Sequence, residues 1–89
     1  MNAVIAVTGK DATGIVAKVS TKCAEYGANI TDISQTVLDG YFTMIMIVDI
    51  GGLTIEFSDF IDAMTELGKK SGLIITTMHE QIFNTMHEI

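Results

Sequence analysis

The chain has 89 residues, enough for one domain with a hydrophobic core but near the size at which stability is marginal. Its net charge is −6 and its five basic residues are all lysine. It therefore offers neither guanidinium groups nor a positive field, which disfavours binding to nucleic acid or to an acidic membrane. Cys23 is the single cysteine, which excludes an intramolecular disulfide and a thiolate metal cluster.

Hydrophobic residues make up 48% of the sequence and charged residues only 18%, which is much apolar surface for a small two-layer domain to hide. We therefore expect self-association. No apolar run approaches the ~18 residues of a membrane span, and the N-terminus lacks the basic stretch and cleavage site of a signal peptide. These features predict a single domain over residues 1–89 and a cytoplasmic location.

Residues 2–8, NAVIAVT, are rich in β-forming side chains and are bounded by Gly9, so we expect a strand. The following segment, GKDATG at 9–14, has the glycine spacing of a phosphate-binding P-loop. That motif requires Lys and then Ser or Thr directly after its second glycine, to reach phosphate and Mg²⁺. Here an Ile-Val pair stands at that place, Lys10 lies on the wrong side of the loop, and Asp11 adds a negative charge. The segment therefore argues against a nucleotide site.

What remains is a turn that leads into a helix, predicted over residues 14–26. Apolar side chains mark one face of this helix at helical spacing: Ile15, Val16, Val19, Cys23 and Tyr26. Asp11 or Thr13 can supply the N-cap oxygen, and Gly27 is the expected stop. The free amides at the start of such a helix can receive a small anion.

Two strands and a tight turn follow. Residues 29–38, NITDISQTVL, alternate between more polar and more apolar positions, which predicts a half-exposed or edge strand. Residues 41–50, YFTMIMIVDI, are almost wholly apolar and predict a central strand. The dipeptide Asp39-Gly40 between these runs indicates a two-residue hairpin turn.

The last third of the chain predicts a helix, a strand and a short terminal helix. Residues 54–70 carry a helical stripe that ends before Ser71-Gly72: Ile55, Phe57, Phe60, Ile61, Met64 and Leu67. Residues 73–80, LIITTMHE, predict a fourth strand, and residues 81–89 predict an amphipathic helix with the stripe Ile82, Phe83, Met86 and Ile89. The order β-α-β-β-α-β plus a tail predicts an α+β, ferredoxin-like two-layer sandwich. Two helices should cover one face of a four-stranded antiparallel sheet.

Two functions of this fold are disfavoured by the residues. An RNA-recognition module needs aromatic and basic side chains together on its third strand, but Tyr41 and Phe42 are adjacent, should point to opposite faces, and have no basic residue nearby. An acylphosphatase needs an arginine in its first loop, and the sequence contains none.

Other candidate sites have simpler interpretations. His79 and His87 are too few for zinc without carboxylate help and sit on different predicted elements. Cys23 lies on an apolar helix face, where a buried thiol is inert. Four acids recur at helical spacing, Glu56, Asp59, Asp62 and Glu66, which indicates a solvated face more readily than a cation groove. No spacing nominates a nucleophile, so we expect no enzyme, no metal site and no cofactor.

The segment TGKDATGIVAKVSTKCAEYGANITDIS resembles the opening of an ACT domain, a small ligand-binding module of amino-acid metabolism. The shared pattern is a strand, Asp-x-x-Gly-Ile-Val, a helix, and Gly-x-Asn-Ile at the second strand. In this chain the pattern falls on Asp11, Gly14, Ile15, Val16, Gly27, Asn29 and Ile30. The likeness covers nearly the whole chain and is greatest to free-standing proteins of the UPF0237 type, then to glycine-cleavage regulators and to the N-terminal module of formyltetrahydrofolate hydrolase. Thr13 departs from the family pattern, which often has proline before the loop glycine.

The resemblance implies a regulatory protein that forms a homodimer or higher homo-oligomer, often edge to edge, and binds an amino acid near the interface. The expected ligand-binding residues are Asp11, Ala12, Thr13, Gly14, Ile15 and Asn29. Backbone amides of the turn could hold the carboxylate, Asp11 could accept from the ammonium, and Asn29 can donate and accept. Alternatively Asp11 only caps the helix, Gly14 permits close packing and Asn29 satisfies a turn. That reading leaves a ligand-free module that binds an unidentified protein partner.

Overall fold

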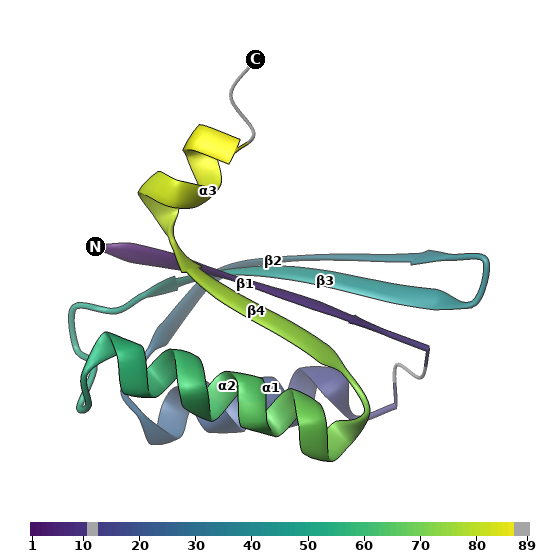
Figure 1. Cartoon of the computed structure of the whole chain (residues 1–89), viewed down its shortest axis with the longest axis horizontal. Coiled ribbons are helices and arrows are strands. Elements are labelled where there is room, and N and C mark those ends of the chain that lie inside the picture. The colour runs from purple at the N-terminus through teal and green to yellow at the C-terminus, as the bar shows by residue number, and fades with distance from the viewer. Residues whose placement is uncertain (11–12, 87–89) are drawn as a thin grey trace.

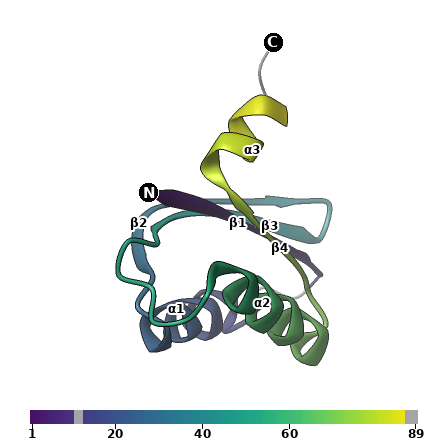
Figure 2. The same cartoon turned by 60° about the vertical axis from the view of Figure 1, so that its left-hand side comes forward.

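The computed structural model describes residues 1–10 and 13–86 (Figures 1 and 2). Its elements in chain order are β1 (Asn2–Gly9), α1 (Ile15–Glu25), β2 (Asn29–Leu38), β3 (Tyr41–Asp49), α2 (Phe57–Ser71), β4 (Ile74–His79) and α3 (Glu80–Met86). The predicted order of strands and helices is confirmed, including the C-terminal helix. Residues 87–89 of that predicted helix lie outside the described residues.

The four strands form one antiparallel sheet in the order β2-β3-β1-β4. β1 and β3 are therefore central and β2 and β4 are edges, as predicted for residues 29–38 and 41–50. In β2 the register shifts between Ile30 and Asp32. There the hydroxyl of Thr31 donates a hydrogen bond of 3.1 Å to the carbonyl oxygen of Ile47. The predicted hairpin is confirmed, because Asp39 and Gly40 have φ angles of 53° and 82°, as a type I′ turn requires.

Both long helices lie on one face of the sheet, which Figures 1 and 2 show from two directions. Alternate residues of β1, namely Ala3, Ile5 and Val7, are buried in the core formed with these helices. Between the helices, the rings of Tyr26 and Phe60 meet edge to face with their centroids 6.3 Å apart. The predicted two-layer arrangement is confirmed.

The opposite face of the sheet carries α3, which points away from the layer of α1 and α2 (Figures 1 and 2) and contacts β1 and β4. On this outer face Val4 lies between Ile47 and Met78 of the neighbouring strands and is only 2% exposed. Ile74 and Ile82 are 72% and 55% exposed. The outer face is thus apolar and partly covered. Among the described helices, none is both long and apolar enough to cross a membrane.

Candidate functional site

The predicted ligand loop connects the end of β1 to the start of α1. Gly14 occupies the N-cap position with a φ of 72°, a left-handed conformation that glycine adopts without strain. Gly14, and neither Asp11 nor Thr13, therefore occupies the N-cap position. That the side-chain oxygen of Asp11 or Thr13 caps the helix stays a prediction. The carbonyl oxygen of Gly14 accepts the first helical hydrogen bond, 3.0 Å from the amide of Lys18. Asp11 and Ala12 lie outside the described residues.

The side chains at this turn divide between solvent and core. Thr13 and Gly14 are exposed, whereas the side chain of Ile15 is buried in the main core. Ile15 can therefore offer a ligand only its backbone. The first amides of a helix have no carbonyl partner within that helix, so they are potential donors to a ligand. Such donors, together with the positive end of the helix dipole, are suited to a carboxylate.

Asn29 lies at the other end of the sheet from this turn. Asn29 pairs with Asp49, and Asp49 pairs on its other side with Asn2 at the start of β1. The turn follows Gly9 at the far end of β1, which places it on the order of 20 Å away. The expectation that one chain brings Asn29 beside the turn is therefore wrong. A role for Asn29 at this turn stays a prediction and requires a second copy of the chain.

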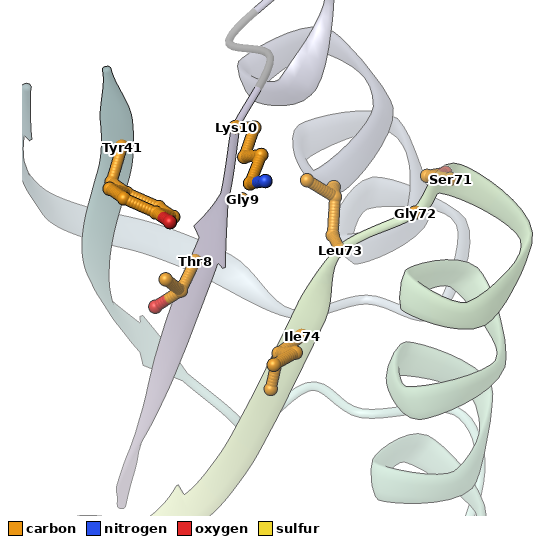
Figure 3. Close-up of a pocket in the computed structure, with 8 residues that line it drawn as sticks. All are labelled: Thr8, Gly9, Lys10, Tyr41, Ser71, Gly72, Leu73 and Ile74. Atoms are coloured by element: carbon orange, nitrogen blue, oxygen red, sulfur yellow. The ribbon is translucent and has the colours of Figure 1, made fainter. Parts of the chain in front are cut away.

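A cavity of about 370 Å³ lies next to the turn, where β1 ends and β4 begins (Figure 3). We call it the Lys10 pocket, and its walls are residues 8–10, Tyr41 and residues 71–74. The ammonium of Lys10 lies 5.8 Å from the centre of the Tyr41 ring, which is within cation–π range. Figure 3 shows the Lys10 side chain running along β1 past Gly9, with Tyr41 on one side and Leu73 on the other.

The residues of this pocket were not predicted from the sequence. They come from the end of β1, the start of β3 and the connection from α2 to β4, and no local spacing predicts that these segments meet. The sequence contained one feature that pointed to this pocket: the ring of Tyr41 was expected to point away from that of its neighbour Phe42. The structure confirms this expectation, since Tyr41 is 49% exposed and Phe42 is buried. An exposed aromatic ring beside a hairpin turn is a candidate for ligand contact.

His79 and Cys23 have structural roles. Nδ1 of His79 accepts a hydrogen bond of 3.2 Å from the amide of Gln81, and its ring meets the edge of Phe57 with centroids 6.4 Å apart. His87 lies outside the described residues. Cys23 is fully buried, and this burial raises the pKa of its thiol to about 11, which agrees with the predicted inert thiol.

The acidic candidates are surface residues. All four side chains are exposed on or next to α2: Glu56, Asp59, Asp62 and Glu66. This exposure agrees with a solvated helix face. Across residues 1–10 and 13–86, no three His, Cys, Asp or Glu side chains are grouped closely enough to hold a metal ion.

Comparisons with known proteins agree with this architecture. Residues 2–77 match the family model described as an ACT domain. A UPF0237 protein from Clostridium perfringens is 49% identical over 89 residues, covering 100% of both sequences. A solved ACT domain protein from Streptococcus pneumoniae is 44% identical, with a TM-score of 0.83 over 93% of each chain. A solved formyltetrahydrofolate deformylase from Pseudomonas syringae pv. tomato shares the fold, with 24% identity and a TM-score of 0.77 over 86% of this chain and 26% of that one.

Proposed function

The chain belongs to the ACT domain family, and from this premise we propose that it is a small, non-enzymatic regulatory protein that binds an amino acid or a similar small metabolite. Ligand binding changes the assembly of the protein or its binding to a partner. The predicted resemblance to ACT domains of the UPF0237 type is confirmed by the match over residues 2–77 and by the relatives of equal length. The cytoplasmic location and the single-domain organisation stay predictions.

The exposed start of α1 is the observation that carries the proposal. Gly14 faces open space, since a Cβ atom built on it would meet no atom within 4 Å. The amides of the first helical turn follow it in the chain and suit the carboxylate of an amino acid. Asp11 precedes them in the chain and can accept from the ammonium group. The proposed ligand site comprises Asp11, Ala12, Thr13, Gly14 and Ile15, with Asn29 supplied by a second copy.

We propose no catalytic step, because neither Cys23 nor His79 is suited to one. Cys23 is buried with a raised pKa and cannot present a thiolate to a ligand. His79 uses Nδ1 to accept the hydrogen bond from Gln81, on an edge strand at the far end of the sheet from the turn. A binding role therefore fits the turn better than nucleophilic chemistry does.

A thermal-shift screen of the whole chain against the amino acids tests the proposal. A ligand that binds only the native state at a hundred times its Kd stabilises that state by about 2.7 kcal/mol. For a domain of this size, each kcal/mol raises the Tm by about 4–8 °C. We expect at least one amino acid to give such a shift, and we expect Asp11→Ala and Asn29→Ala to reduce it. Asp62→Ala, an exposed acid on α2, is the matched control and should leave the shift unchanged.

The alternative function is a protein-interaction module that has no ligand. The exposure of Ile74 on the outer face of the sheet and of Ile82 on α3 favours it, because such side chains are typical of contact surfaces. A screen in which no amino acid changes the Tm would support this alternative. Undiminished ligand affinity in both Asp11→Ala and Asn29→Ala would instead remove the proposed site.

A further inference from the structure

We propose that the Lys10 pocket is a second small-molecule site, which binds a carboxylate carrying an aromatic or branched apolar group. The pocket lies between β1 and the start of β4, and no described residue of its walls belongs to the first turn of α1. The inference therefore goes beyond the proposed function and does not depend on it.

The charge of the pocket selects an anion. Among the described residues that line it, Lys10 alone is charged, in a chain whose net charge is −6. Within the described part of the chain, no carboxylate lies within ion-pair distance of Lys10, and the contact of its ammonium is with the ring of Tyr41. An ammonium held over an aromatic ring still has donors available for a carboxylate, with which it forms charge-assisted hydrogen bonds.

Hydroxyl groups add further donors to the same walls. Thr8 lies at the end of β1 and Ser71 at the end of α2, and both line the cavity (Figure 3). Each hydroxyl can donate one hydrogen bond, and an ionised carboxylate can accept about four in total. In Figure 3 the Thr8 side chain points away from Lys10 and Ser71 lies beyond Leu73, so these hydroxyls add polar edges to the pocket and Lys10 is the main partner for a carboxylate. A neutral amide of the same shape would gain less from the ammonium.

Two other walls of the pocket, Tyr41 and Ile74, carry exposed apolar surface. Tyr41 is 49% exposed and Ile74 is 72% exposed, so a ligand group that covers them removes apolar surface from water. The face of the Tyr41 ring is also suited to stacking with a second ring. The volume of about 370 Å³ is near the lower end of the roughly 300–1,000 Å³ range of small-molecule pockets, which fits a ligand with a single ring or a branched chain.

A glycine shapes one wall of the pocket. A Cβ atom on Gly9 would collide with Cδ2 of Leu73, so the missing side chain at position 9 lets Leu73 lie against β1 in this conformation. This contact places Leu73 beside Lys10, as Figure 3 shows. The apolar wall and the ammonium are thus adjacent, as a ligand that joins a carboxylate to an apolar group requires.

The test uses phenylacetate and its neutral isostere phenylacetamide, titrated into the whole chain and followed by amide resonances in NMR spectra. We expect phenylacetate to shift the amides of Gly9, Gly72 and Ile74, and phenylacetamide to bind at least tenfold more weakly. Lys10→Gln should weaken the binding of phenylacetate at least tenfold and remove the preference for the acid over the amide. Lys18→Gln, an exposed lysine on α1, is the matched control and should bind like the wild type.

Several results would overturn the inference. They are the absence of shifts at the pocket amides with millimolar phenylacetate, equal affinity for the acid and the amide, and unchanged binding in Lys10→Gln. Shifts confined to Gly14 and Ile15 would place the carboxylate at the start of α1, which would support the proposed function and contradict the Lys10 pocket. A protein that binds phenylacetate at the pocket but gives no thermal shift with any amino acid would support the pocket alone.

Discussion

The amide of Leu73 donates a hydrogen bond of 2.8 Å to the carbonyl oxygen of Gly68, which ties the end of α2 to the start of β4. A Cβ atom on Gly68 would lie 2.8 Å from the carbonyl oxygen of Leu73 and 3.1 Å from Cγ1 of Ile75. The helix and the strand therefore approach each other backbone to backbone, with room for a hydrogen atom but not for a methyl group.

Gly68→Ala is expected to destabilise the fold. In a helix interior, alanine is normally more favourable than glycine by about 1 kcal/mol, so helix propensity alone predicts that the variant is more stable. The contacts with Leu73 and Ile75 oppose this gain, because adding a methyl group to a well-packed site costs about 1–3 kcal/mol. We expect a net loss in the free energy of unfolding, measured by urea denaturation. Glu66→Ala, at an exposed position of the same helix, should change it little, and an increase in stability for Gly68→Ala would contradict the close approach.

The hairpin between β2 and β3 depends on backbone conformation at two positions. Gly40 has a φ of 82°, so Gly40→Ala should cost about 1–2 kcal/mol, the penalty for an L-residue in the left-handed region. Asp39→Asn should leave stability equal or slightly higher, because Asn-Gly is the preferred pair for this turn. Urea denaturation of both variants measures the difference, and equal stabilities would show that the turn tolerates a side chain at position 40.

The sequence predicted the elements because each has its own local signal. Alternation marked β2, a continuous apolar run marked β3, and helical stripes marked α1 and α2, while Asp39-Gly40 fixed the hairpin. The ends of the elements were predicted less accurately than their order. The second helix begins at Phe57 and not at residue 54. Thr54 instead belongs to the connection before the helix, where its amide and its hydroxyl both donate hydrogen bonds to the carbonyl oxygen of Tyr26. A stripe of apolar residues at helical spacing does not show whether a residue at its start lies in the first turn of the helix or in the connection before it.

The candidate site was less predictable than the fold. Local sequence identified the glycine turn before α1, but it could not tell at which end of the sheet Asn29 lies, because that depends on strand pairing across Asp49. It also could not bring Lys10 and Tyr41 together, since the 30 residues between them in the chain include α1 and β2. Long-range pairing decides both questions.

Stability at alkaline pH should depend on Cys23. Burial raises the pKa of this thiol from 9.0 to about 11, so the folded state favours the neutral form more than the unfolded state does. The resulting stabilisation is fully present below pH 9 and is lost as the pH rises from 9 to about 11. A shift of this size corresponds to at most about 3 kcal/mol.

The measurement compares urea denaturation of the wild type and of Cys23→Ala under reducing conditions across this pH range. The variant loses packing at every pH, but it lacks the titrating thiol. We therefore expect the stability of the wild type to fall toward that of the variant as the pH rises. Parallel pH profiles would show that the thiol ionises equally well in both states.

The last prediction is that the native species is at least a dimer, built through the sheet edges and the C-terminal segment. The structure adds two observations to the apolar composition of the chain. Val37 on the edge strand β2 is 69% exposed, and Ile82 remains 55% exposed on α3, although α3 contacts its own β1 and β4. Fully burying two large apolar side chains contributes about 3–6 kcal/mol before the costs of association. The contact of α3 with its own sheet supports the alternative, in which the tail covers only its own chain.

Light scattering on the full chain and on a version truncated after Glu80 separates these possibilities. If α3 forms the interface, the full chain is a dimer at micromolar concentration and the truncated chain is a monomer. Two equally dimeric proteins would assign the interface to the sheet edges, with Val37→Lys on β2 as the next variant, because an inserted charge at an edge opposes strand pairing. A monomeric full chain would contradict the dimer and leave Ile82 as ordinary exposed surface.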